Sequence, residues 1–380
     1  MYQSMKILQL GKFYPIKGGV EKVMYDMLLG LSQRGISCDM MCAVTGGQKP
    51  GIIRLNGYAR LLCVPALTKL KATMIAPAMI RQLYRRRKEY DVIHVHHPDP
   101  MAAMALYLSG YKGNVALHWH SDIVKQNMLL RLYTPLQNWL IKRADVIVGT
   151  SPVYTERSPY LREVQHKTMC IPIGIEEPQR DLPAEEQVKV RYAGKRIVFS
   201  LGRLVDYKGY RFLIEAARLL PDDCVVLIGG DGPLKEVLQK QIDCYGLQSK
   251  IELLGFLSDE ELPAYFGACN LFVLSSIQKT EAFAIVQVEA MAFGKPVVAT
   301  RIENSGVSWV NAHGISGLNA LPCSGKELAD AMLMLLDNDE LYKNLSTGAR
   351  RRYEEMFTRR MMIDRCVQLY NSIVNGAVMR

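Results

Sequence analysis

The feature that most constrains the fold is a regular alternation of short apolar runs with longer amphipathic segments. Seven strand-like runs occupy the first half of the chain, at residues 6–11, 38–44, 60–65, 91–97, 114–120, 145–151 and 168–174. Six more follow, at residues 196–204, 224–230, 251–256, 271–276, 295–300 and 316–321. Helix-length segments such as 20–34 and 135–143 separate them. This alternation predicts parallel sheets covered by helices on both faces.

The two series of strands predict two α/β domains. The break between them falls at "GIEEPQRDLPAEEQ", residues 174–187, where proline and charge replace apolar periodicity. We expect an N-terminal Rossmann-like domain over residues 1–178, a C-terminal one over 190–355, and a final helix over 356–380. Doubly wound folds bind ligands outside the carboxyl ends of their strands, so a cleft between two such domains is the expected site.

Composition favours a soluble, intracellular protein. The chain has 380 residues and 49% hydrophobic content, enough for two separate cores. Its nine cysteines form no CxxC pair and most lie in apolar runs, which is typical of reduced, buried thiols. We find no signal-peptide pattern, and no apolar run approaches the roughly 18 residues of a membrane span.

Charge is unevenly distributed along the chain. Residues 1–175 carry 23 Lys and Arg but only 10 Asp and Glu, a net charge of +13, whereas the rest has a net charge of −3. The densest basic segment contains Arg81, Arg85, Arg86, Arg87 and Lys88. Aromatic residues do not interleave with it and no nucleic-acid motif is present, so nucleic acid is not expected as a partner. An anionic membrane surface and an ordinary solvated helix face both remain open.

Two groups of residues in the N-terminal half follow strand-like runs. Gly18 and Gly19 precede an amphipathic helix that starts near residue 20, where a phosphate or a sugar could approach the backbone, although such a turn is often purely structural. His120 ends a strand whose His118 lies on the same face, as do two further histidines in "DVIHVHH". Four histidines suggest zinc, but neither a helical His/Glu pair nor a cysteine partner accompanies them. We therefore expect no metal site.

In the C-terminal half, cationic residues follow the first strand. Arg203 and Lys208 lie in "GRLVDYKG", and a planar guanidinium with a mobile ammonium suits the two phosphates of one diphosphate. The spacing alone is a weak signal, because it is frequent by chance. The turn "GGDGP" at residues 229–233 resembles a phosphate loop only superficially, and we interpret it as structural.

Two carboxylates, Glu281 and Glu289, frame the stretch "EAFAIVQVE". Glu281 ends a loop after a strand, a helix is predicted to begin over Phe283–Val286, and Glu289 lies about one turn inside it. Backbone N–H groups at that helix start can hold a phosphate. A carboxylate within an apolar helix requires a partner, and sugar hydroxyls on either side of a diphosphate would serve both acids. The pattern favours a nucleoside-diphosphate sugar as ligand.

Across essentially its whole length, the chain resembles the family 4 retaining glycosyltransferases of GT-B architecture. The shared motifs are "KGGVEKV", "HWHSD", "GRLVDYKG", "GDGP" and "EAFAIVQVEAMAFGKPVVAT", in this order. The resemblance implies a final helix that crosses back to the N-terminal domain, and metal-independent transfer without a cofactor. It implies a catalytic set of His120, Arg203, Lys208 and Glu281. It also implies a donor-binding set of Gly18, Gly19, Arg203, Lys208, Glu281, Ala282, Phe283, Ala284, Ile285 and Glu289.

By matched positions, the resemblance assigns a role to each main residue. Gly19 lies near the donor phosphate and His120 near the reacting face of the sugar. Arg203 and Lys208 bind the diphosphate. Glu281 binds hydroxyls of the donor sugar, and Glu289 binds those of the ribose. The family usually has glycine where this chain has Ala282 or Ala284, so an added methyl lies near the expected phosphate.

The resemblance also indicates a reaction and partners. We expect front-face substitution with retention, in which the leaving phosphate helps to deprotonate the acceptor hydroxyl. The motifs are similar to those of bacterial mannosyl- or rhamnosyl-type transferases of surface polysaccharide synthesis, which favours GDP-mannose, with UDP-sugars close behind. The acceptor is expected to be lipid-linked or an oligosaccharide, at the inner face of the cell membrane. A GT-B sugar-nucleotide epimerase and a non-catalytic sugar-binding protein are the alternatives.

Overall fold

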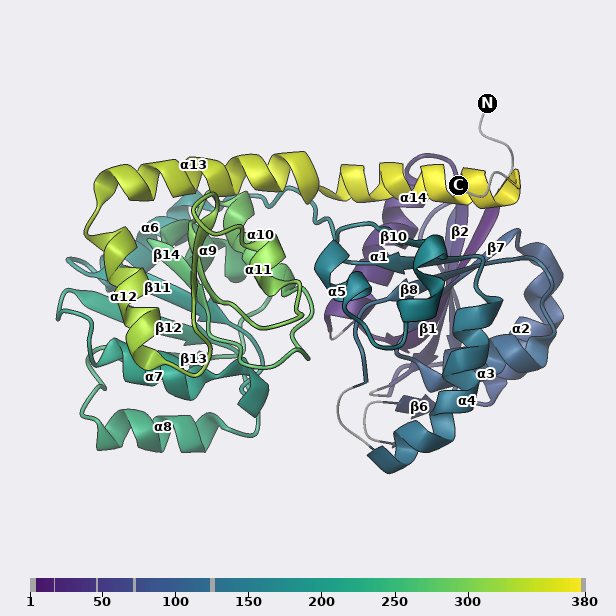
Figure 1. The fold of residues 1–380 in the computed structure, drawn as a ribbon, viewed down its shortest axis with the longest axis horizontal. Helices are drawn as coiled ribbons and strands as arrows, with labels where there is room; N and C mark the ends of the chain where they lie inside the picture. The colour runs from purple at the N-terminus through teal and green to yellow at the C-terminus, as the bar shows by residue number, and fades with distance from the viewer. Residues whose placement is uncertain (1–4, 17, 46, 71–72, 124–126, 377–380) are drawn as a thin grey trace. The chain divides into compact units, whose positions relative to one another are not determined.

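A computed structural model describes residues 5–16, 18–45, 47–70, 73–123 and 127–376. The chain divides into two compact units (Figure 1). Unit 1 comprises residues 1–174 together with 359–380, and unit 2 comprises residues 175–358. Each unit is built on one mainly parallel sheet flanked by helices, which confirms the predicted α/β class with two doubly wound sheets.

Unit 1 contains an eight-stranded sheet with the strand order β10-β9-β8-β7-β1-β2-β4-β3. All pairs are parallel except β3 with β4. The strands are β1 (Lys6–Tyr14), β2 (Ser37–Val44), β3 (Gly51–Arg54), β4 (Ala59–Val64), β7 (Val92–His97), β8 (Asn114–Trp119), β9 (Val146–Gly149) and β10 (Thr168–Cys170). A separate hairpin pairs β5 (Thr68–Leu70) with β6 (Thr73–Ile75).

Helices cover both faces of the unit 1 sheet. They are α1 (Gly19–Ser32), α2 (Ala78–Arg86), α3 (Pro100–Ser109), α4 (Asn127–Arg143), α5 (Pro152–Glu156) and α14 (Arg359–Val374), with 3-10 turns at Arg87–Glu89 and Arg162–Lys167. Helix α1 packs on β1 and β2 and against α14, while α3 packs on β1 and β7 between α2 and α4. The C-terminal helix α14 thus closes unit 1 rather than unit 2.

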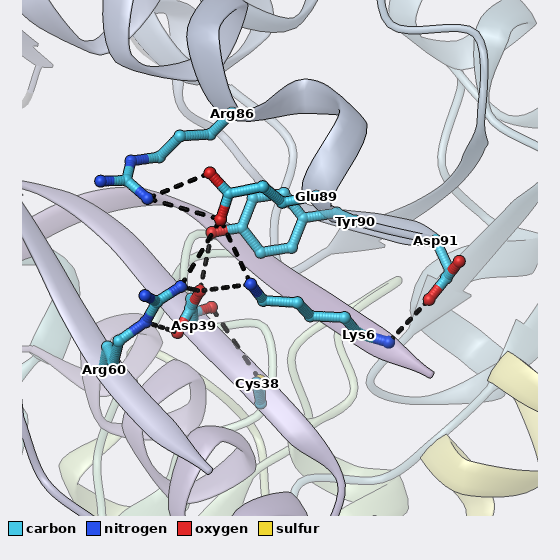
Figure 2. A network of polar contacts seen from close by, with 8 residues as sticks. All are labelled: Lys6, Cys38, Asp39, Arg60, Arg86, Glu89, Tyr90 and Asp91. Carbon is cyan, nitrogen blue, oxygen red and sulfur yellow. Dashed lines mark hydrogen bonds and ion pairs between the residues drawn. The ribbon is translucent and has the colours of Figure 1, made fainter. Parts of the chain in front are cut away.

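A charged network occupies the amino ends of the unit 1 strands (Figure 2). Asp39, which is 2% exposed, accepts hydrogen bonds from Arg60 at 2.9 and 2.6 Å and from the Tyr90 hydroxyl at 2.7 Å. Glu89 accepts one from Arg86 at 3.1 Å. A buried carboxylate is tolerated only when it is paired and hydrogen-bonded. Ligands bind at the opposite, carboxyl ends of the strands. We therefore interpret this network as stabilising the amino ends of the strands and not as part of a ligand site.

Unit 2 contains a six-stranded, fully parallel sheet with the order β13-β12-β11-β14-β15-β16. Its strands are β11 (Arg196–Leu201), β12 (Cys224–Gly229), β13 (Ile251–Gly255), β14 (Leu271–Leu274), β15 (Val297–Thr300) and β16 (Gly317–Ala320). Its helices are α6 (Leu182–Arg191), α7 (Tyr210–Ala217), α8 (Lys235–Cys244), α9 (Leu262–Ala268), α10 (Ile285–Ala292), α11 (Val307–Val310), α12 (Gly325–Leu336) and α13 (Asp339–Met356), with a 3-10 turn at Asp206–Lys208.

Alternating residues of the unit 2 strands enter two different cores. Val198 of β11 faces an aliphatic core that includes Leu213 of α7 and Met332 of α12. Its neighbour Phe199 points to the other face, where its ring packs edge-on against Phe266 of α9 at a centroid distance of 5.2 Å. This period of two is the geometry of a pleated strand buried on both faces.

All thirteen predicted strands are present, and three further strands were not predicted. Strands β3, β5 and β6 have three or four residues each, and all four residues of β3 are exposed. Each strand contains at most two apolar residues, fewer than the run of about four on which the prediction depends. None of the described helices combines the length and apolar character that a membrane span requires.

Candidate active site

The predicted donor-binding residues of unit 2 follow two neighbouring strands. From β11 the chain proceeds outward to β12 and β13, then returns to β14 on the other side of β11. The boundary between β11 and β14 is therefore the topological switch point, where open α/β sheets bind ligands. Arg203 and Lys208 follow β11, and residues 281–284 follow β14. The sequence therefore places both groups at this point.

The loops after β11 and β14 are held together through their backbones. Gly209 has a φ of +66°, and a Cβ atom there would lie 2.2 Å from the carbonyl oxygen of Ser275. Only glycine fits this position. The Ser275 hydroxyl in turn donates to the carbonyl oxygen of Lys208 at 2.9 Å. These contacts fix the segment that carries Lys208 against the loop that leads to Glu281.

Lys208 and Glu281 form an ion pair. The Lys208 ammonium lies 2.6 Å from Oε2 of Glu281, and both side chains are 11% exposed. The Ser276 hydroxyl donates to the same oxygen at 2.8 Å. Burial by itself would lower the pKa of Lys208, but the Glu281 carboxylate and two tyrosine hydroxyls outweigh burial and hold it above its usual range. The structure joins two residues that the sequence assigned to different parts of the ligand.

Helix α10 begins at Ile285, within the predicted start. Ala284, the residue before it, has a φ of 60° and a ψ of 80°. Non-glycine residues rarely adopt this region. Ala284 has no side-chain oxygen that could cap the helix, so N–H groups of the first turn can bind a ligand. Ala282 and Phe283 are 8% and 3% exposed, and the Phe283 ring packs edge-on against Phe357. They can therefore reach a donor mainly through their backbone.

Glu289 and Arg203 lie outside the ion pair. Glu289 lies one turn into α10 and is half-buried, while Arg203 is exposed in the loop after β11. Both remain predicted ligand contacts.

The N-terminus of α1 in unit 1 carries an acid that the prediction did not include. Gly18 is the N-cap, and both Gly18 and Gly19 are exposed, so backbone there is accessible. However, Oε2 of Glu21 lies 2.5 Å from where a Cβ of Gly18 would be. Burial raises the pKa of Glu21, although Lys12 and backbone N–H groups oppose this. A phosphate at Gly19 would have to share the helix start with this carboxyl group.

Four histidines of unit 1 form one continuous stack. His94 and His96 of β7 lie beside His118 of β8 and His120 just after it, with neighbouring ring centroids 4.1–5.3 Å apart. The first three are 0% exposed and His120 is 6% exposed. Burial and the neighbouring positive groups lower the pKa of His120 well below its usual range. His120 is therefore a neutral imidazole at pH 7.

The stack is a poor match for a metal site. Ring nitrogens of His94, His96 and His118 lie within 4.8 Å of one another. Their planes, however, differ by only 19–23°, so the lone pairs run side by side instead of converging on one point. Both nitrogens of His96 also have hydrogen-bond partners. The absence of a metal site stays a prediction.

Sequence reasoning missed the polar partners of this stack. Gln9 of β1 and Tyr370 of α14 are fully buried and hydrogen-bonded to His96 and His94. Gln9 had a usable signal, because a glutamine inside the apolar run "KILQL" is expected to be buried and paired. Tyr370 had none, since 276 residues separate it from His94.

A pocket of about 580 Å³ opens at the carboxyl ends of β1, β2 and β4. Phe13, Val44, Pro65 and Met74 line it with apolar surface, and Gln48 adds a polar group. The position matches the ligand-binding edge of a parallel sheet. It is a candidate site in unit 1 that no motif indicated.

The family models cover nearly the whole chain. Residues 17–177 match glycosyltransferase family 4, and residues 182–352 match glycosyl transferases group 1. The chain is 32% identical over 379 residues to O-antigen chain mannosyltransferase C of Escherichia coli, covering 98% of this chain and 100% of the relative. It is 29% identical over 362 residues to the D-rhamnosyltransferase WbpZ of Pseudomonas aeruginosa, covering 93% and 92%.

A solved structure supports the fold. HepE of Anabaena, crystallised with UDP, superimposes with a TM-score of 0.77 at 20% identity, covering 97% of this chain and 100% of HepE. The two mainly parallel sheets, the switch-point residues and the full-length match to a mannosyltransferase agree with one another. The chain therefore belongs to the family 4 glycosyltransferases, group 1, and is a glycosyltransferase of GT-B fold.

Proposed function

We propose that the protein is a retaining transferase that uses GDP-mannose as its sugar donor in surface polysaccharide synthesis. The ion pair of Lys208 and Glu281 beside the uncapped start of α10 carries the proposal. It places a cation, a carboxylate and backbone N–H groups at one switch point, which suits a sugar diphosphate. The similarity to a mannosyltransferase and a rhamnosyltransferase of bacteria supports the sugar class and pathway. UDP-sugars are the second candidate donors.

Each group has a role in the proposed transfer. Arg203, Lys208 and the start of α10 neutralise the diphosphate as the bond between its oxygen and the anomeric carbon breaks. The acceptor hydroxyl oxygen forms the new bond on the same face, and its proton passes to an oxygen of the leaving phosphate. Glu281 binds hydroxyls of the donor sugar and Glu289 those of the ribose. Because two side-chain cations supply the positive charge, the reaction is expected to need no metal.

We place the acceptor in unit 1. The pocket at the carboxyl ends of β1, β2 and β4 has the size and mixed lining of a small-molecule site. His120, in the same unit, contacts the reacting sugar in this proposal. The acceptor is lipid-linked or an oligosaccharide, and the enzyme works at the inner face of the cell membrane.

Helix α2 and its flank supply the membrane contact in this proposal. Arg81, Arg85 and Lys88 are exposed, whereas Arg86 is paired with Glu89. Three exposed cations would gain roughly 3 kcal/mol at an anionic surface, at about 1 kcal/mol each.

Exposed apolar side chains accompany these cations. Tyr84 of α2 is 54% exposed and stacks with the Arg87 guanidinium. On the neighbouring helix α3, Tyr107 and Leu108 are 52% and 51% exposed. Aromatic and basic side chains together are typical of membrane interfaces. We therefore expect membrane binding that weakens with salt but is not abolished by it.

The donor assignment is tested by screening GDP-mannose and a panel of UDP-sugars for thermal stabilisation, followed by assays of nucleotide release with and without a lipid-linked acceptor. Stabilisation by GDP-mannose and acceptor-dependent GDP release support the proposal. Conversion of the sugar nucleotide without acceptor would instead identify an epimerase. Binding without turnover would identify a sugar-binding protein.

The membrane contact is tested by sedimentation with anionic liposomes at low salt. The test variant reverses Arg81, Arg85 and Lys88 to glutamate. The matched control reverses the same number of exposed lysines in unit 2, at Lys189, Lys240 and Lys326. Only the first variant should lose liposome binding and transfer to a lipid-linked acceptor. Equal loss of liposome binding in both variants would indicate that the exposed side of α2 is an ordinary solvated helix face.

A further inference from the structure

His120 is one end of a hydrogen-bond chain through the interior of unit 1. Its Nε2 lies 2.9 Å from Nδ1 of His96, whose Nε2 lies 2.6 Å from Oε1 of Gln9. The amide nitrogen of Gln9 lies 3.3 Å from the Tyr370 hydroxyl, which lies 2.6 Å from Nδ1 of His94. Apart from His120, every member is 0% exposed. This hydrogen-bond chain joins the end of β8 to β7, β1 and α14.

The Gln9 amide sets the direction of the protons. Its oxygen can only accept, so Nε2 of His96 must carry a proton. A neutral imidazole has a single N–H, which leaves Nδ1 of His96 as an acceptor. Nε2 of His120 must then donate to it, and Nδ1 of His120 keeps its lone pair. Burial lowers the pKa of His96 and of His120 well below the usual range, which keeps both rings neutral.

The hydrogen-bond chain leaves one nitrogen of His120, Nδ1, available to a ligand. Among the described residues, Nδ1 of His120 has no hydrogen-bond partner, and His120 is the only member of the stack with any exposed surface, at 6%. An imidazole lone pair accepts a hydrogen bond from a hydroxyl but repels the oxygens of a phosphate. The available atom thus matches a sugar hydroxyl and not a diphosphate.

We propose that Gln9 and His96 are positioning residues that hold His120 as the Nε2–H tautomer, so that its Nδ1 accepts a hydrogen bond from a sugar hydroxyl during transfer. This inference rests on the proposed function, in which His120 contacts the reacting sugar. Because the tautomer is fixed before the substrate binds, the imidazole needs no reorganisation during the reaction. The hydrogen bond that one ring nitrogen of a histidine makes commonly determines which nitrogen carries the proton.

His118 provides a matched control within the same stack. Its ring lies parallel to that of His120 at a centroid distance of 4.1 Å, and His118 is 0% exposed. Neither of its nitrogens has a partner among the described residues. Substitution of His118 therefore disturbs the packing around His120 but leaves the hydrogen-bond chain intact.

The tautomer is measured directly by long-range ¹H–¹⁵N correlation in ligand-free protein with ¹⁵N-labelled histidine. The chain has only seven histidines, so the signals can be assigned by substitution. We expect a protonated Nε2 and an unprotonated Nδ1 for His120 in the wild type and in His118→Phe. Gln9→Leu should allow the other tautomer of His120 to form. A proton on Nδ1 of His120 in the wild type would overturn the proposal.

Kinetics with GDP-mannose tests the consequence for transfer. In Gln9→Leu, kcat should fall about tenfold, the scale of one lost hydrogen bond. The KM for the donor should hardly change, because the donor residues lie in unit 2. His118→Phe should lose little of the rate. An unchanged kcat in Gln9→Leu would refute the positioning role. If the wild type turns over no sugar nucleotide, the proposed function fails, while the tautomer measurement still decides the proton arrangement.

Discussion

Mild acid should unfold unit 1, because this unit buries several neutral histidines. The pKa values of His94, His96, His97, His118 and His120 are all lowered by burial, that of His118 to about 3. In the unfolded chain each imidazole titrates near the ordinary value of 6.5. Below that pH the unfolded state binds protons that the folded state does not bind. The free energy of unfolding therefore falls as the pH falls.

The size of this effect follows from the same values. From pH 6.5 to 5.5, one such histidine costs about 1 kcal/mol of folding free energy, so the five together cost about 5 kcal/mol. A typical domain has a total stability of about 5–15 kcal/mol. Glu21, whose pKa burial raises, has an effect of the opposite sign on stability, but it is a single group against five. Unit 1 should therefore lose much of its stability by about pH 5.5.

Urea unfolding followed by tryptophan fluorescence can isolate this unit. Trp119 and Trp139 belong to unit 1 and Trp309 to unit 2, so a Trp309→Phe variant reports on unit 1 alone. In this background, His118→Phe should remove about one fifth of the pH dependence, whatever it does to stability at pH 7. His166→Gln, at an exposed histidine of the same unit, should leave the fall of the urea midpoint between pH 7 and 5.5 unchanged. A urea midpoint that stays constant from pH 7 to 5.5 would refute the reasoning.

Three further predictions concern the donor site. Glu289→Gln should weaken nucleotide binding by roughly ten- to a hundred-fold, the cost of a charge-assisted hydrogen bond, with an unchanged melting temperature; equal calorimetric affinity in both proteins would remove Glu289 from the site. Arg203→Ala should lower kcat by about 10²–10³-fold, because leaving-group charge grows in the transition state; a rise in KM alone would indicate uniform binding. Ala284→Gly should stabilise the protein by about 0.5–1 kcal/mol, since it relieves a positive φ, whereas Ala282→Gly should destabilise it by a similar amount in the same denaturation assay.

The fold could be predicted from the sequence because buried parallel strands are continuous apolar runs. Every strand of this kind was found, whereas β3, which pairs antiparallel at the edge of the sheet and is exposed, was not. The site was predictable only in part. The motifs placed Lys208 and Glu281 at one edge, but whether they contact a ligand or each other depends on how two loops are locked by Gly209. The partners of the histidine stack depend on long-range packing that no local pattern encodes.

In the proposed donor site, we expect the ion pair between Lys208 and Glu281 to select ligands that satisfy both residues. An inorganic anion that draws Lys208 away leaves the Glu281 carboxylate buried without its cationic partner, which is unfavourable. A sugar diphosphate brings phosphate oxygens and hydroxyls together and so satisfies both groups. The GDP affinity of Glu281→Gln should accordingly exceed that of the wild type, and a lower affinity would contradict this view. After transfer of the sugar, the remaining nucleoside diphosphate satisfies only Lys208, so we expect re-formation of the ion pair to promote release of the product.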